Sequence, residues 1–84
     1  MNIKKDFSEY TRTEFSHLIT AIKSNQISAS RKLGLIMHFD KIVGHPEGAD
    51  LIFFPEVGAD DSIEGITRAI ETWRAHVGLP GFNA

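Results

Sequence analysis

Four histidines and eleven acidic residues are the side chains of this 84-residue chain that could act as general acids, general bases or metal ligands. A zinc site on a helix needs two histidines four residues apart, as in an HExxH motif, and the sequence contains no such pair. His38 and Asp40 come nearest to an acid–base pair, but residues two apart on a helix do not face each other. We therefore predict no catalytic residue, no metal ligand and no cofactor.

The sequence also lacks the residue patterns of nucleophilic catalysis. It contains no cysteine, which excludes thiol nucleophiles, thiolate zinc sites and disulfides. The serines lie mostly where helix caps and turns favour serine, and no nucleophile elbow surrounds any of them. We expect a protein that is not an enzyme.

The middle of the chain has the composition of a binding surface. Residues 38–65 carry seven acidic residues and one lysine, and this acidic block contains Phe53 and Phe54. The four consecutive apolar residues of "DLIFFP" cannot all point inward from one helical turn, so at least one is expected to face solvent. An exposed ring beside carboxylates is typical of a protein-binding hot spot, and the negative charge favours a cationic partner. The alternative, that both phenylalanines fill the end of a helical bundle, stays open on these residues alone.

Helical periodicity predicts one all-α domain over residues 1–84, since no strand-like alternation, internal repeat or long linker appears. Thr11 and Glu14 form a capping box that begins the first helix, and Asp50 is suited to cap a short third one. The predicted elements are helices over about 12–24 and 29–43, one short helix or turn from Asp50 to Pro55, and a last helix from Asp61 or Ser62 to Gly78.

Apolar spacing predicts which helical faces form the core. In the second helix, Leu33 lies about 120° and Met37 about 160° from Phe39, the centre of the apolar stripe, so both are expected on a second, exposed face. Truncation of a core residue in the last helix is expected to lower stability by about 2–5 kcal/mol. The predicted core positions of that helix are Ile63, Ile66, Ile70, Trp73 and Val77.

The start of the chain predicts neither export nor membrane insertion. Two lysines in "MNIKKDFSEY" are followed by no apolar run, and the longest apolar runs, "LIM" and "LIFF", are far below the roughly 20 residues that span a bilayer. The absence of cysteine suits a reducing compartment. We expect a cytoplasmic protein.

The chain contains four segments that together form a family pattern: "SEYTRTEF", "HPEGADLIFFP", "DDSIEGI" and "WRAHVGLPGF". Their order and separations resemble those of the immunity proteins of colicin E-type and S-type pyocin DNases. The resemblance covers nearly the whole chain. Its most specific part is the run from His45 to Pro55, followed by Ser62, Gly65, Trp73, Arg74 and Gly81.

This resemblance implies a small, distorted antiparallel four-helix bundle with a short third helix. It also implies a function: binding the cytotoxic HNH nuclease domain of a cognate bacteriocin inside the producing cell. Inhibition in that family is by an exosite, in which the immunity protein sits beside the metal-dependent active site and keeps DNA phosphates out by bulk and negative charge. The acidic block suits this mechanism, because a nuclease surface is basic.

The resemblance assigns binding roles to two of the predicted helices. The short third helix supplies a shared anchor, here Asp50 with Phe53 and Phe54, and the second helix supplies the residues that select one nuclease over others. The implied nuclease-binding residues are Lys32, Leu33, Met37, Asp40, Glu47, Asp50, Phe53, Phe54 and Pro55. No direct binding of nucleic acid or membrane is implied.

Two departures from the family pattern affect specificity. The two aromatic positions are tyrosines in the family, and Phe53 and Phe54 keep the ring but lack the hydroxyl. Each missing hydrogen bond costs about 0.5–1.5 kcal/mol if the partner retains its half. Arg31 and Lys32 stand where the family is usually acidic, which favours acidic or neutral groups on the nuclease at this end of the second helix.

Two other functions fit parts of the sequence. A helical adaptor or regulatory domain would bind a partner that is not a nuclease. A small DNA-binding domain would use Arg31 and Lys32, but the acidic block argues against it, because affinity for phosphates rests on Lys and Arg.

Overall fold

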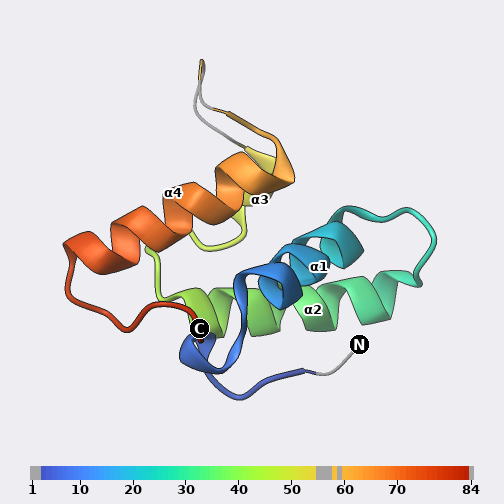
Figure 1. Cartoon of the computed structure of the whole chain (residues 1–84). Helices are drawn as coiled ribbons and strands as arrows, with labels where there is room; N and C mark the ends of the chain where they lie inside the picture. The colour runs from blue at the N-terminus through green and yellow to red at the C-terminus, as the bar shows by residue number, and fades with distance from the viewer. Residues whose placement is uncertain (1–2, 55–57, 59, 84) are drawn as a thin grey trace.

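The computed structural model describes residues 3–54, 58 and 60–83, and every regular element among them is helical (Figure 1). The elements are a 3-10 helix, η1 (Phe7–Glu9), and the α-helices α1 (Arg12–Lys23), α2 (Ala29–Val43), α3 (Asp50–Phe53) and α4 (Ile63–His76). Figure 1 shows α1 and α2 side by side and running in opposite directions, and α1 also contacts α4. The all-α class and the positions of the predicted helices are confirmed.

Side-chain caps fix where the three long helices begin. At α1, the Thr11 hydroxyl accepts a hydrogen bond from the Glu14 N–H (3.1 Å), and the Glu14 carboxylate accepts one from the Thr11 N–H (2.9 Å), which confirms the predicted capping box. The hydroxyls of Ser28 and Ser62 each accept from the backbone N–H three residues further along, at the starts of α2 and α4. These caps satisfy donors that have no partner within the helix itself.

The core lies between α1, α2 and α4 and contains the apolar stripe predicted around Phe39 in the second helix. α1 buries Phe15, Leu18, Ile19 and Ile22. The buried residues of α2 are Leu35, Phe39, Ile42 and Val43, and those of α3 and α4 that join the same cluster are Ile52, Ile66 and Ile70.

The N-terminal segment and the C-terminal tail complete this core, a contact that helical periodicity did not predict. Phe7 and Tyr10 are buried. Phe82 stacks on Phe7 with ring centroids 4.5 Å apart, and its ring centroid lies 5.4 Å from that of Phe15. The N–H of Asn83 donates to the carbonyl of Tyr10 (2.9 Å). The segment around Phe7 and Tyr10 and the tail at Phe82 and Asn83 are therefore held to each other and to α1.

The core face predicted for α4 is partly wrong. Trp73 is only half-buried, with its ring against that of His45 (centroids 4.4 Å apart), and Val77 is exposed. Thr67 and Arg74 are buried in their place. Both are polar, so a pattern of apolar residues does not include them. Each forms hydrogen bonds in the interior, which offset part of the cost of burial.

Arg74 joins α4 to the end of α2 and to the tail. Its Nη1 donates to the carbonyls of Ile42 (3.2 Å) and Val43 (2.7 Å), and its Nε donates to the carbonyl of Pro80 (3.0 Å). The guanidinium lies 4.1 Å from the centroid of the Phe7 ring. Burial lowers the pKa of Arg74, but an arginine keeps its charge in a protein, so a buried cation links three segments.

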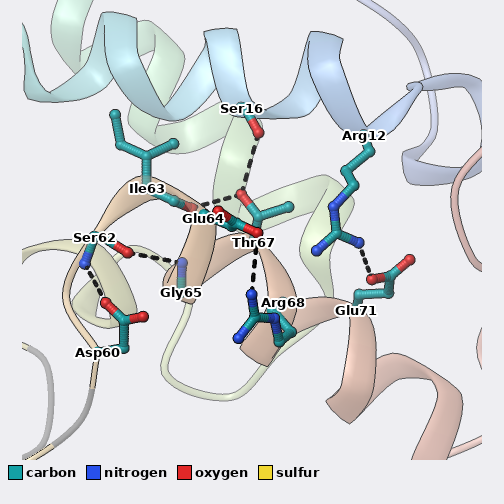
Figure 2. A network of polar contacts seen from close by, with 10 residues as sticks. All are labelled: Arg12, Ser16, Asp60, Ser62, Ile63, Glu64, Gly65, Thr67, Arg68 and Glu71. Atoms are coloured by element: carbon teal, nitrogen blue, oxygen red, sulfur yellow. Dashed lines mark hydrogen bonds and ion pairs between the residues drawn. The ribbon is translucent and has the colours of Figure 1, made fainter.

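Polar side chains join α1 to α4 beside the core (Figure 2). The hydroxyl oxygens of Ser16 and Thr67 lie 3.4 Å apart, and Thr67 also donates to the carbonyl of Ile63 (2.7 Å). Arg12 forms an ion pair with Glu71. Within the described residues, no helix is long and apolar enough to cross a membrane.

Candidate protein-binding surface

The short helix α3 and its C-cap residue present two phenylalanines to solvent. Phe53 is 39% exposed and Phe54 is 77% exposed. The same turn directs Ile52 into the core, and Leu51 packs against the core while half-buried. The prediction that "DLIFFP" exposes at least one apolar residue is confirmed, and the alternative that both phenylalanines fill the end of the bundle is wrong. One helical turn distributes four side chains around its circumference, so two of them face water.

The beginning of α3 is held from α2, and the predicted cap is wrong. Asp50 is the first residue of α3, its neighbour Ala49 is the N-cap residue, and no side chain of α3 caps it. Instead, Asp40 Oδ1 in α2 accepts a hydrogen bond from the Ala49 N–H (2.6 Å). Gly48 turns the chain here at a φ of +49°, and a Cβ at that position would collide with the Asp40 carboxylate. The position of α3 therefore depends on a side chain of α2.

The face of α2 that includes Asp40 also carries exposed apolar side chains. Leu33 is 57% exposed and Met37 is 63% exposed, which confirms their predicted place off the core stripe. Leu33, Met37 and Asp40 follow each other at spacings of four and three, so they share a face of the helix. Because Asp40 contacts the residue before α3, this face of α2 leads to the turn that bears Phe53 and Phe54.

The remaining predicted binding residues are Lys32, Glu47, Asp50 and Pro55. Glu47 and Asp50 are exposed, and Lys32 is half-buried. The backbone N–H of Glu47 donates to Nδ1 of His45 (3.0 Å). Pro55 lies outside the described residues. Sequence reasoning placed Asp40 on this edge but missed its bond to Ala49, which joins residues from two different elements.

Another acidic residue, Asp60, serves the fold locally. Its Oδ1 accepts from the Ser62 N–H (2.9 Å), and hydrogen bonding to Ser62 lowers the pKa of Asp60. The Ser62 hydroxyl accepts in turn from the Gly65 N–H (3.0 Å) (Figure 2). A Cβ at Gly65 would lie 2.6 Å from Asp60 Oδ2, so a side chain there would displace the carboxylate. Asp60 therefore positions the start of α4.

Two of the histidines, His38 and His45, have structural contacts. Nε2 of His38 lies 2.8 Å from the hydroxyl of Tyr10, which also accepts from the Lys4 N–H (3.1 Å). Partial burial, with a smaller contribution from the positive charge of Lys41, lowers the pKa of His38. The tautomer of His38 decides which of the two groups donates this hydrogen bond, and the partner of His38 is Tyr10 and not Asp40. Among the described residues, no three His, Asp or Glu side chains come together to hold a metal ion.

Three comparisons place this chain among known proteins. The family model described as "Colicin immunity protein / pyocin immunity protein" matches residues 7–76. The pyocin-S1 and pyocin-S2 immunity proteins of Pseudomonas aeruginosa are each 34% identical over 86 residues, which cover 98% of this chain and 99% of each relative.

Solved structures show the same fold. A chain of the crystal structure of the pyocin AP41 DNase–immunity complex is 36% identical and superposes with a TM-score of 0.88, covering 100% of this chain and 97% of that one. A chain of the crystal structure of the mutant nuclease domain of pyocin S8 with its cognate immunity protein is 35% identical, with a TM-score of 0.86, covering 96% of this chain and 100% of that one.

Proposed function

Because this chain belongs to the colicin and pyocin immunity protein family, we propose that α2 and α3 form the surface by which it recognises a nuclease. The protein is a bacteriocin immunity protein, an inhibitor and not an enzyme, and its partner is the nuclease domain of a bacteriocin. We further propose that this nuclease is of the HNH type and that inhibition takes place in the cytoplasm of the producing cell.

One observation carries the proposed surface: the ring of Phe54 is 77% exposed on the same helical turn as the exposed carboxylate of Asp50. Exposing a large ring to water is unfavourable in the free protein, and covering it with a partner recovers that free energy. Phe53 adds further apolar area on the same turn. The exposed acids Asp40, Glu47 and Asp50 lie on or beside the elements that form this surface, and their negative charge attracts and orients a basic partner.

The exposed face of α2 supplies the selective part of this surface. Leu33 and Met37 offer apolar area that a nuclease of matching shape covers and a mismatched one leaves open. Lys32 lies next to Leu33 and places a positive charge there, which favours an acidic or neutral group on the cognate nuclease. Pro55 follows Phe54 directly and completes the set of proposed contacts.

We propose that the bound protein inhibits from an exosite. Its acidic block, residues 38–65, lies beside the active site of the nuclease and repels the phosphates of approaching DNA. The bulk of the helical bundle blocks the same approach sterically. No side chain of the inhibitor is required to enter the active site or to bind its metal ion.

The experiment that tests this function is an inhibition assay against a panel of purified HNH bacteriocin nuclease domains. Wild type, Phe54→Ala and a control, Val77→Ala, are compared at low and moderate salt. Val77 is exposed and apolar but lies outside the proposed surface. Inhibition of one nuclease by wild type and Val77→Ala, with its loss in Phe54→Ala, supports the proposal. Equal inhibition by all three proteins removes Phe54 from the interface, and silence of a folded wild type across the panel favours a helical adaptor.

A further inference from the structure

A pocket of about 390 Å³ lies where the N-terminal segment, the last turn of α2 and the C-terminal tail meet. Its lining includes Lys5, Asp6, Ser8, Lys41 and Arg74. None of the residues that line it belongs to the proposed nuclease-binding surface. Its volume is at the small end of the range for pockets that hold ligands, so it suits a small ion or group rather than a large molecule.

The buried side of this pocket holds the charge of Arg74. That side chain is 6% exposed, and its acceptors are three backbone carbonyls. The hydrogen bonds use Nε and Nη1, whereas Nη2 makes none to the described residues. No carboxylate of the described residues forms an ion pair with Arg74. The carbonyls at the end of α2 offset part of its charge, but a buried cation ordinarily has an anionic partner as well.

The open side of the pocket adds more positive charge. Lys5 and Lys41 both line it and are exposed, and neither is in an ion pair with a described residue. Asp6 is the one acidic residue in the lining, so three cations face one carboxylate. The Ser8 hydroxyl is a further hydrogen-bond donor. Cationic and hydroxyl donors in this arrangement are the usual ligands of phosphate oxygens.

We propose that this pocket binds a small oxyanion of the phosphate type, held by the ammonium groups of Lys5 and Lys41 and by the guanidinium of Arg74. The anion supplies the negative charge that the buried arginine lacks. It joins the N-terminal segment to α2 and α4, because its ligands come from all three. Binding therefore stabilises the folded protein.

The test uses inorganic phosphate as the probe and thermal unfolding of the full chain as the measurement. Phosphate is titrated at pH 7 with the ionic strength held constant by sodium chloride. For the wild type we expect a rise in Tm that grows with the logarithm of the phosphate concentration above the dissociation constant, and that reaches about 5 °C or more at ten times this constant. The double variant Lys5→Gln/Lys41→Gln is expected to lose most of this rise. Lys23→Gln, which removes a lysine outside the pocket, is expected to keep it.

Phosphate also stabilises proteins without binding, because it is excluded from their surfaces. That effect grows in proportion to the phosphate concentration and is equal in all three proteins, so such a result overturns the proposal. A logarithmic rise of equal size in the wild type and the double variant overturns it too, because the two lysines are then not ligands. Arg74 is left unchanged throughout, since its loss would remove contacts of the core.

Nuclear magnetic resonance of His38 gives a second readout. The charge of Lys41 contributes to the lowered pKa of His38, after burial. An anion on Lys41 offsets that charge, so the pKa of His38 is expected to rise when phosphate binds. The rise is expected in the wild type and in Lys23→Gln but not in the double variant. An unchanged pKa of His38 at saturating phosphate in the wild type contradicts binding at Lys41.

Discussion

The contact between α1 and α4 and the surface formed by α2 and α3 use the same kinds of residue in opposite ways. At the α1–α4 contact, apolar side chains are covered, and the polar ones, such as Ser16 and Thr67, pair with each other. On α2 and α3, Leu33, Met37 and Phe54 face water. Fold and recognition therefore occupy different parts of the chain, and substitutions should separate them.

The largest expected effect is on the stability of the fold. Ile70 is 1% exposed in α4, so Ile70→Ala should lower the free energy of unfolding by about 2–5 kcal/mol, since it removes buried methyl groups and leaves a cavity. Urea unfolding measures this loss. Ala69→Gly, on the exposed side of the same helix, is a control with a cost of about 1 kcal/mol. A comparable loss in both variants would show that the core does not depend on Ile70.

On the recognition side, Phe54→Ala should weaken nuclease binding by about 2 kcal/mol or more, a loss of about 30-fold or greater. Its stability should change little, because Phe54 is mostly exposed. Calorimetric titration with the cognate nuclease and urea unfolding of the free inhibitor measure the two quantities. If Phe54→Ala lost stability but kept its affinity for the nuclease, Phe54 would belong to the fold and not to recognition.

Asp40 belongs to both sides, because it holds α3 in place from α2. Asp40→Ala should lower the free energy of unfolding by about 1–2 kcal/mol, since it removes a charged acceptor from the Ala49 N–H. It should also weaken nuclease binding. Asp61→Ala is the matched control, an exposed acid of the same acidic block with no such bond to α3. If the two variants behave alike, general negative charge, and not the position of α3, explains the effect of Asp40.

Substitutions on α2 should change which nuclease the protein prefers more than they lower its affinity for every nuclease. Leu33→Ala and Met37→Ala are expected to alter the ratio of affinities for two related nucleases, whereas Asp50→Ala weakens binding to both. Competition binding with a pair of nuclease domains measures this ratio. Equal losses for both partners from every one of these variants would contradict a separate selecting role for α2.

The smallest expected effect is a dependence of stability on pH through His38. Its pKa is lower in the folded protein than in the unfolded chain, so the unfolded chain takes up a proton more readily. The stability contributed by neutral His38 is present above about pH 6.5 and is lost as the pH falls through the lowered pKa. Urea unfolding at pH 7.5 and 5.5 should show a smaller difference for His38→Gln than for wild type. His17→Gln, on the exposed face of α1, should leave the difference unchanged.

The sequence predicted the parts of this molecule that have local patterns. The capping box at Thr11 and the stripe of α2 depend on neighbouring residues, so spacing alone located both. The composition of "DLIFFP" predicted that at least one apolar residue faces solvent, because a single turn cannot direct all four side chains inward. The apolar face of α2 with Leu33 and Met37 was predicted for the same reason, from the angle between side chains.

The parts that were not predicted depend on contacts between distant segments. Phe82 meets Phe7 from the other end of the chain, and no periodicity marks either residue. Arg74 is charged, and a charged residue is normally assigned to the surface unless its partners are known. Trp73 fits the apolar spacing of α4, but its ring packs against that of His45 and is only half-buried.

The place of Arg74 has a consequence for how the protein is made. A ribosome completes Phe7, η1 and α2 well before it adds Arg74 and the tail with Phe82. Until then, the last carbonyls of α2 and the ring of Phe7 lack the guanidinium that joins them. We therefore expect the nascent chain to acquire its final packing only after Arg74 and Phe82 have been added, so that a fragment that stops before Arg74 does not protect the cell.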